Sequence, residues 1–279
     1  MLVYGDSIET MKREACLSQR AGIRDFSVSF SVPSVTLWWF EPRILDAAWE
    51  VLSGRIPAGR VMKKLVVLAV VVLLGPSAWA VEPEVILEQT INLRPEVLEL
   101  ALEAYEQAEE GGHVRRQVLT IIDYELPSYQ PRLWVIDMRA GRVVYQEWVA
   151  HGMGKPRGSG GTMEEALSFS NDPGTLKSSL GLFITAETYY GRHGYSLKLD
   201  GLEEGVNDNA RERLIVLHGA QYVTEDRADD RLIGRSWGCP AVRPGISKIL
   251  IDAIKDGSVL WIYYPHDEWL EESEFLDEE

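Results

Sequence analysis

The stretch "RLWVIDMRAGRVVYQEWVAHG", residues 132–152, holds two runs rich in β-branched and aromatic residues, joined by the short connection Arg-Ala-Gly. Such a pair predicts a β-hairpin, because these residue types favour strands and a short connection with glycine lets the chain reverse. Further strand-like runs occupy residues 117–126, 180–190, 195–202, 213–220 and 259–264. The sequence therefore predicts a mainly β domain built around an antiparallel sheet.

Two amphipathic helices are expected to flank this sheet. The first, over residues 94–112, repeats apolar residues at helical spacing between a proline and a pair of glycines. The second, over residues 244–258, has Pro244 at its entry and Gly257 beyond its end. Its predicted buried face consists of Ile246, Ile249, Leu250, Ala253 and Ile254.

Two segments show no regular pattern. Residues 152–179 are rich in glycine, serine and proline, and a loop of this length in a compact domain is usually functional or mobile. Residues 266–279 form an acidic tail that is expected to be a solvated, mobile end.

The charge balance limits the partners of the chain. There are 28 lysine and arginine residues against 43 aspartate and glutamate residues, a net charge of −15. Such an excess of acid repels nucleic acid and anionic membrane surfaces. We therefore expect no nucleic-acid partner.

Residues 62–80, "MKKLVVLAVVVLLGPSAWA", have the layout of a secretory signal peptide, with two lysines, an apolar run and a small-residue end. The apolar run is half the ~20 residues of a membrane span, so no stable span is expected in the mature chain. We expect translation to begin at Met62, and residues 1–61 to come from a start site assigned too far upstream. A genuine cytosolic extension before a signal anchor is the alternative. The expected location is periplasmic or elsewhere in the cell envelope.

The chain has two cysteines, and only Cys239 would remain after removal of the leader, because Cys16 precedes it. Cys239 lies in "GRSWGCPAVR", residues 234–243, among glycine, proline, serine and tryptophan. An exported cysteine without a disulfide partner is either a free reactive thiol or an intermolecular bridge. A turn that presents its sulfur to a cleft favours the reactive thiol.

A reactive thiol needs a base, because a cysteine with an ordinary pKa of about 8.5 is mostly protonated at neutral pH. His218 is the strongest candidate, since it ends the strand-like run "RLIVLHG" and Gly219 leaves its flank open. No metal or cofactor is expected, because one exported cysteine without an H-E-x-x-H motif does not make a zinc site. The other histidines are His113, His151, His193 and His266.

The turn around the cysteine supplies further polar groups. Glycine permits unusual dihedrals, so the N–H groups of Gly238 and Cys239 are expected to point at a developing oxyanion. Ser236 is expected to hydrogen-bond across the turn, and Arg243 to bind a substrate carboxylate. Each has a structural alternative: Gly238 only shapes the turn, Ser236 caps it, and Arg243 pairs with a surface acid.

The run "HGAQYVTEDRADDRLIGRSWGCPAVR", residues 218–243, resembles the His-Gly and Ser-x-Gly-Cys signature of the L,D-transpeptidase family. It is most similar to the murein L,D-transpeptidase catalytic-domain-like branch. The resemblance implies a mainly β, β-sandwich catalytic domain with a few flanking helices. We expect this domain over residues 113–265, after an N-terminal helical segment at 81–112 and before the acidic tail.

The same resemblance implies an activity. Such enzymes attack the bond after the third residue of a tetrapeptide stem of peptidoglycan, form a thioester and transfer the acyl group to an amine. Cys239 matches the nucleophile, His218 the general base, and Gly219 the residue whose backbone orients that histidine. Ser236 and Gly238 match the turn before the thiol. The implied partners are peptidoglycan stem peptides.

Two departures from the family pattern concern substrate choice. Trp237 stands where the commoner pattern has a second histidine, and Ala241 where it has asparagine or arginine. Trp237 and Arg243 are therefore candidate substrate contacts.

The walls of an acceptor groove are expected in the irregular loop after residue 151 and in "YYGRHGYSLKLDGL", residues 189–202. Tyr190 and His193 are its candidate contacts, with surface turn residues as the alternative.

Rival assignments fit less well. A papain-like peptidase normally places its cysteine before its histidine, whereas His218 precedes Cys239, and a sortase separates the pair much further in sequence. An L,D-carboxypeptidase with the same thiol chemistry and a non-catalytic peptidoglycan-binding module stay as alternatives. Rapid alkylation of Cys239 at pH 6 would favour an enzyme over the binding module.

Overall fold

A computed structural model of the chain describes residues 82–276. The predicted leader and the residues before it lie outside the described range, as do residues 277–279. The elements in chain order are α4 (Pro83–Leu87), α5 (Pro95–Glu110), β1 (Val118–Asp123), β2 (Leu133–Asp137), β3 (Arg142–Glu147), β4 (Gly181–Gly191), β5 (Gly194–Gly201), η2 (Asp208–Ala210), β6 (Val216–Gly219), α6 (Glu225–Asp229), β7 (Ala241–Val242), α7 (Pro244–Ile254), β8 (Val259–Tyr263) and α8 (Asp267–Glu272).

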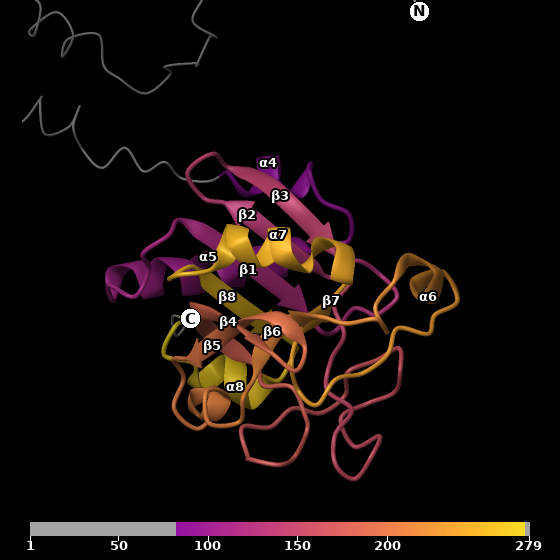
Figure 1. Cartoon of the computed structure of the whole chain (residues 1–279). Helices are drawn as coiled ribbons and strands as arrows, with labels where there is room; N and C mark the ends of the chain where they lie inside the picture. The colour runs from indigo at the N-terminus through magenta and orange to yellow at the C-terminus, as the bar shows by residue number, and fades with distance from the viewer. Residues whose placement is uncertain (1–81, 277–279) are drawn as a thin grey trace, which may run out of the picture. The chain divides into compact units, whose positions relative to one another are not determined.

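The strands form one sheet in the order β3-β2-β1-β8-β4-β5-β6-β7 (Figure 1). Every predicted strand is present, and the hairpin of β2 and β3 is antiparallel as expected. The sheet as a whole is mixed, however, because the β1–β8 and β6–β7 pairs are parallel. Local sequence patterns predict hairpins but carry no information on where β8, the last strand, enters the sheet.

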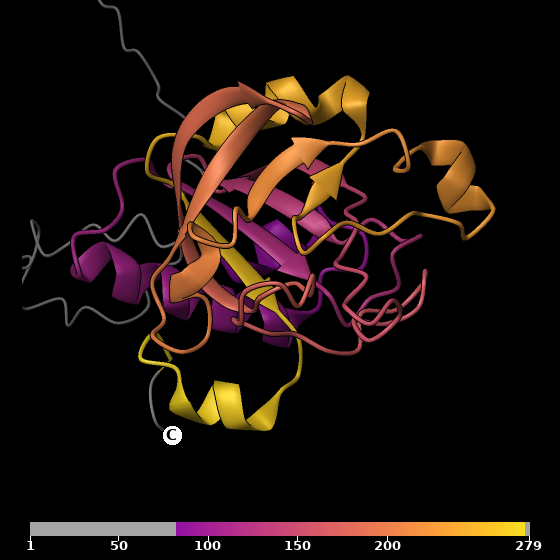
Figure 2. The same cartoon turned by 60° about the horizontal axis from the view of Figure 1, so that its bottom comes forward.

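The sheet bends until its two ends meet. Just beyond β3, Ala150 donates its N–H to the carbonyl of Ala241 in β7 at 2.8 Å, forming an isolated antiparallel bridge. A second bridge joins Gly152 to Ser236. Figure 2 shows the long β4–β5 hairpin curving over one side. Since β3 and β7 are opposite ends of the strand order, the predicted mainly β, sandwich-like fold is confirmed.

The two predicted helices pack on this sheet. α5 contacts β1 and β8, and its buried side chains include Leu98, Ala101 and Tyr105. α7 contacts β5, β6 and β1, so the curved sheet wraps around it. Its buried face differs from the prediction, because Ile249 is 55% exposed and Ile251 is fully buried. The true face is centred one residue further along the helix, where Leu250, Ile251 and Ile254 meet the strands.

The acidic tail is not the solvated end that was expected. The indole N–H of Trp269 in α8 donates to the buried carboxylate of Glu203 at 2.8 Å, and the Ser273 hydroxyl donates to the same oxygen at 3.0 Å. Phe275 is also buried. The tail therefore packs against the domain through its few aromatic residues. None of the helices between residues 82 and 276 is long and apolar enough to cross a membrane.

Candidate active site

The predicted nucleophile and base lie on neighbouring chain segments. Cys239 precedes β7, which pairs in parallel with β6, the strand that carries His218. The Cys239 Sγ lies 3.5 Å from the amide N of Val216 and 3.5 Å from the carbonyl O of Leu214. Because Val216 is two residues before His218, β6 supports both the thiol and the imidazole. The parallel β6–β7 pair thus brings these two residues to one end of the sheet.

Ser236 spans the turn before the thiol. Its hydroxyl accepts the N–H of Gly238 at 3.1 Å and donates to the carbonyl of Cys239 at 2.6 Å. Gly238 has a φ of +110°, and a Cβ at this position would lie 2.7 Å from the carbonyl of Lys177, so only glycine fits without strain. The Gly238 N–H is used inside the turn. Of the two expected oxyanion donors, the N–H of Cys239 is the one without a bond to another residue among the contacts of residues 82–276.

The turn rests on the long loop, residues 152–179. The Ser178 hydroxyl donates to the carbonyl of Gly238 at 3.1 Å and accepts the N–H of Gly152 at 3.0 Å. The N–H of Ser236 donates to the carbonyl of His151, just before this loop, at 2.8 Å. The loop therefore has a defined role, because Ser178 holds the backbone of the turn.

His218 is held in the tautomer that a base requires. Its Nδ1 lies 3.0 Å from the carbonyl O of Gly219. A carbonyl only accepts, so Nδ1 carries the proton and Nε2 has a free lone pair. His193 stacks on the imidazole with ring centroids 4.3 Å apart. Burial lowers the pKa of His218, and the nearby His193 lowers it further against the opposing effect of the Gly219 bond. The imidazole is therefore neutral at pH 7.

Cys239 is protonated in the same environment. Burial raises the pKa of its thiol, while the Val216 N–H and the Arg213 guanidinium oppose this effect without reversing it. No hydrogen bond joins Sγ to the imidazole of His218 in the described part of the chain. The two shifts favour a neutral thiol beside a neutral imidazole. The electrostatics of the site therefore do not favour the rapid alkylation at pH 6 that would distinguish an enzyme from a binding module.

Arg213 is a site residue that the sequence did not single out. Its guanidinium donates to the carbonyls of Ser170 at 2.6 Å and Lys177 at 2.7 Å, within the long loop. It also lies close enough to Cys239 to lower the pKa of the thiol. Arg213 stands three residues before β6, and the sequence around it indicates only the start of a strand.

The sequence also did not predict that Arg132 and His151 form a buried pair. The fully buried Arg132 donates to the carbonyl of Val149 at 2.9 Å and to Nδ1 of His151 at 3.0 Å. Since arginine only donates, Nδ1 accepts, and Nε2–H donates to the carbonyl of Thr162 at 3.0 Å. Burial and the Arg132 charge lower the pKa of His151 to about 3. His151 is therefore an anchor for the turn and not an alternative base.

The predicted substrate contacts are placed differently from one another. Arg243 donates through Nε and Nη2 to the carboxylate of Glu147 at 2.8 and 2.5 Å. It therefore pairs with an acid, as in the structural alternative, but this acid is buried and not at the surface. Its role as a carboxylate ligand stays a prediction that requires release from Glu147. Trp237 is 62% exposed beside the thiol turn, and Tyr190 is 78% exposed near the tip of the β4–β5 hairpin.

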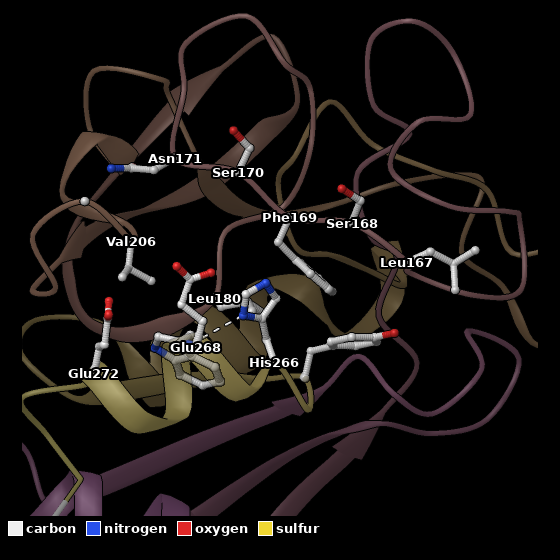
Figure 3. Close-up of a pocket in the computed structure, with 13 residues that line it drawn as sticks. Leu167, Ser168, Phe169, Ser170, Asn171, Leu180, Val206, His266, Glu268 and Glu272 are labelled. Atoms are coloured by element: carbon white, nitrogen blue, oxygen red, sulfur yellow. Dashed lines mark hydrogen bonds between the residues drawn. The ribbon is translucent and has the colours of Figure 1, made fainter.

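Two cavities are relevant to this centre, and neither is lined by Cys239 or His218. One of about 370 Å³ is lined by Tyr264 and by Phe169, Glu268 and the α8 cap residue His266, the last three of which are labelled in Figure 3. The dashed line in Figure 3 is the bond from the Trp269 N–H to His266. A cavity of about 440 Å³ lies beside the base, where Gly219 and His193 line it. Within residues 82–276, no group of three His, Cys, Asp or Glu side chains comes together as a metal site.

Much of the chain is similar to known proteins. Residues 89–263 match the L,D-transpeptidase catalytic domain family. Among solved structures, the chain is similar to the L,D-transpeptidases of Mycobacterium smegmatis (14% identity, 53% of this chain and 59% of that one, TM-score 0.31) and Xylanimonas cellulosilytica (14%, 67% and 93%, 0.32). It is also similar to that of Stackebrandtia nassauensis (15%, 61% and 68%, 0.32).

Two further findings limit what these comparisons show. The chain spans only about half the length of several of the solved structures that it resembles, 50% in one case and 59% in another. No curated protein matches the chain. The family match covers well over half of the sequence and includes the turn of Cys239 and the strand of His218. This chain belongs to the L,D-transpeptidase catalytic domain family.

Proposed function

We propose that this protein is an exported, cysteine-dependent L,D-transpeptidase that acts on peptidoglycan stem peptides through a thioester on Cys239. The observation that carries the proposal is the arrangement across β6 and β7. The thiol of Cys239 and the imidazole of His218, whose Nε2 has a free lone pair, lie on these neighbouring segments, together with the N–H of Cys239. Each group fits one need of acyl transfer: a nucleophile, a base and an oxyanion donor.

The first half-reaction begins from the neutral pair. His218 Nε2 takes the thiol proton as Sγ bonds to the carbonyl carbon of the third residue of the stem. The N–H of Cys239 stabilises the oxyanion of the tetrahedral intermediate. When the intermediate collapses, the C–N bond breaks and His218 returns the proton to the leaving amine of the fourth residue. The thioester remains on Cys239.

The second half-reaction reverses these roles. An acceptor amine attacks the thioester carbon, the C–S bond breaks, and the amine proton passes through His218 to the thiolate. If water attacks instead, the product is a free tripeptide acid. Amide formation therefore needs an acceptor held at high effective concentration beside the thioester.

Export is supported by residues 62–80, whose positive start, short apolar run and small-residue end are those of a signal peptide. We propose that cleavage follows Ala80 and that the mature protein acts in the periplasm or cell envelope. Analysis of the intact mass of exported protein checks this: a mature chain beginning at Val81 is expected, and retention of residues 1–61 would contradict it.

The activity is tested by incubating the purified protein with tetrapeptide muropeptide, followed by mass spectrometry. The expected products are a cross-linked dimer that has lost the terminal residue and, with an added D-amino acid, an exchanged tetrapeptide. Cys239→Ala, which changes little volume, is the control and should give neither. Shortened tripeptide alone would indicate an L,D-carboxypeptidase. An untouched tetrapeptide would contradict the proposal and favour a binding module.

A further inference from the structure

The cavity of about 370 Å³ has no role in the steps above, since neither Cys239 nor His218 lines it. It lies between residues 167–171 of the long loop, residues 205–206 before η2, and α8 with the chain that leads into it (Figure 3). A cavity of this size is within the range that holds a small molecule or one long side chain. Its lining combines aromatic and aliphatic side chains with two exposed acids.

The aromatic wall is fixed by contacts with other parts of the domain. The Trp269 side chain is buried, and its indole N–H donates to the Glu203 carboxylate at 2.8 Å. The ring centroids of Phe169 and Tyr264 lie 4.8 Å apart, and Phe169 also stacks on Tyr124 at 6.0 Å. Because these contacts already hold the rings, the wall needs little ordering when a ligand binds.

The two acids of the lining have no partner in the described part of the chain. Glu268 and Glu272 are exposed, and neither forms an ion pair or a side-chain hydrogen bond among the contacts of residues 82–276. They are four residues apart on α8, so their side chains lie on one side of the helix, where like charges repel. No lysine or arginine is among the described residues that line the cavity. A cation bound there would relieve the repulsion.

Two other polar side chains of the lining already have partners. The Ser168 hydroxyl accepts a hydrogen bond from Nζ of Lys177 at 2.8 Å. His266 caps α8, because its Nδ1 accepts the backbone N–H of Trp269 at 3.4 Å. The charge that the cavity offers to a ligand is therefore that of the two carboxylates.

One apolar side chain extends the lining at the surface. Leu167 is 54% exposed, and the long loop, residues 152–179, exposes no other large apolar side chain. In the view of Figure 3, Leu167 lies on the other side of Phe169 from Glu268 and Glu272. A ligand that contacts both the acids and Leu167 is therefore longer than a single cationic group, which favours a segment of peptide.

We infer that this cavity binds an arginine side chain from a basic segment of a partner protein, with an apolar neighbour of that arginine on Leu167. A guanidinium suits the lining because its planar fork pairs with carboxylates and its face stacks on aromatic rings. The excess of acid in the chain, a net charge of −15, also attracts a basic partner. Since the thiol and the base lie outside the lining, the inference does not depend on the proposed activity.

The test uses two small probes with the full protein. One is acetyl-leucyl-arginine amide, and the other is acetyl-leucyl-citrulline amide, which has nearly the same shape without the charge. The affinity of each is measured from the shift of the Trp269 indole N–H signal in NMR spectra during titration. We expect the arginine probe to bind about 10-fold more tightly, the combined range of one exposed ion pair and one cation–π contact.

Variants of the lining locate this preference. Glu268→Gln combined with Glu272→Gln should remove most of the preference for the arginine probe. Glu271→Gln changes an exposed acid of α8 that does not line the cavity, so this matched control should keep the preference. Leu167→Ser should weaken both probes equally, because it removes apolar contact and no charge.

Four results would overturn the inference. The first is equal affinity of the wild type for the two probes. The second is a loss of preference in Glu271→Gln as large as in the double variant, which would make overall charge the cause. Agmatine, an arginine side chain without a peptide, should bind more weakly than the arginine probe, and equal affinity would replace the peptide segment with a free cation. Finally, a change in the sedimentation of the protein alone on Leu167→Ser would place a second copy of the chain in the cavity.

Discussion

Two histidines in this protein stand in the same local sequence and have opposite chemistry. His151 and His218 each end a run of strand-like residues, each is followed by glycine, and they are 0% and 2% exposed. Both nitrogens of His151 are occupied, by Arg132 and by the carbonyl of Thr162. Only Nδ1 of His218 is occupied, by Gly219. The partners of the ring, and not its motif or burial, decide which histidine is available for proton transfer.

The difference divides the site into two sides. On the supporting side, Arg132 and His151 fix the backbone of Ser236 and hence the turn of the thiol. On the reactive side, His193 stacks on the imidazole of His218 and lines the cavity of about 440 Å³. Substitutions on the supporting side are expected to change stability first, and those on the reactive side to change rate first.

The largest expected effect separates the two histidines directly. His218→Ala should lower kcat/KM for muropeptide by ~10²–10⁴, which is the range for loss of a general base. It should also slow alkylation of Cys239 at neutral pH. His151→Asn keeps an acceptor for Arg132 and should retain most of the activity. Equal losses of activity in the two variants would contradict the assignment of His218 to catalysis and of His151 to support of the turn.

The second prediction concerns Arg132 on the supporting side. Arg132→Met leaves the carbonyls of Val149 and Leu126 and Nδ1 of His151 without their donor, which costs roughly 3 kcal/mol of folding free energy. The thermal midpoint should fall by about 10 °C, as measured by circular dichroism. Arg142→Met, at an exposed position in β3, is the control. Equal midpoints for the two variants would show that the buried arginine does not support the fold.

These two sides also show what the sequence could predict. The strands of the β2–β3 hairpin, the helix α5, and the pair His218 and Cys239 all carry local signals, either a period or a motif with glycine. Arg132, Arg213 and the β1–β8 pairing carry none, because their partners lie far away in sequence. Arg213, for example, acts on Cys239 and on the long loop, and only the folded chain brings these together.

The acidic tail, residues 266–279, also has contacts that its composition does not predict. Its acidic residues predicted a solvated end, but Trp269 and Phe275 bury it against Glu203 and its surroundings. The Glu203 carboxylate accepts hydrogen bonds from Leu182, Trp269 and Ser273. Two of these donors, Trp269 and Ser273, belong to the tail, so Glu203 binds the tail directly. A pattern of net charge cannot show that a few aromatic residues are enough to dock a segment.

The third prediction is a pH dependence of stability. The pKa of His151 is about 3 in the folded protein, below its ordinary value, so the unfolded chain binds a proton that the folded chain excludes. The contribution of neutral His151 to the free energy of unfolding is therefore complete above pH ~6.5 and is lost as the pH falls toward 3. Between pH 7 and pH 4 the free energy of unfolding of the wild type should fall by roughly 3 kcal/mol more than that of His151→Asn, as measured by urea unfolding. If the free energies of unfolding of the two proteins change equally with pH, the role of His151 is contradicted.

The smallest expected effect concerns His193. His193→Phe keeps a ring on the imidazole of His218 but removes a group that lowers the pKa of that base. The pKa of His218 should rise, and since the neutral imidazole is the active form, activity should be lost at a higher pH than in the wild type. The acid limb of the kcat/KM profile should move up by less than ~1 pH unit. A shift toward lower pH would show that the stacked ring acts on His218 in another way.

The central claim, that Cys239 is acylated by the stem peptide, is tested most directly by intact-mass spectrometry after rapid quenching with acid. The protein incubated with tetrapeptide muropeptide should gain the mass of the substrate minus its terminal amino acid. Proteolysis should locate this adduct on the peptide that contains Cys239, and Cys239→Ala should show no adduct. Products that form with no adduct on Cys239, or in the Cys239→Ala variant, would contradict the account.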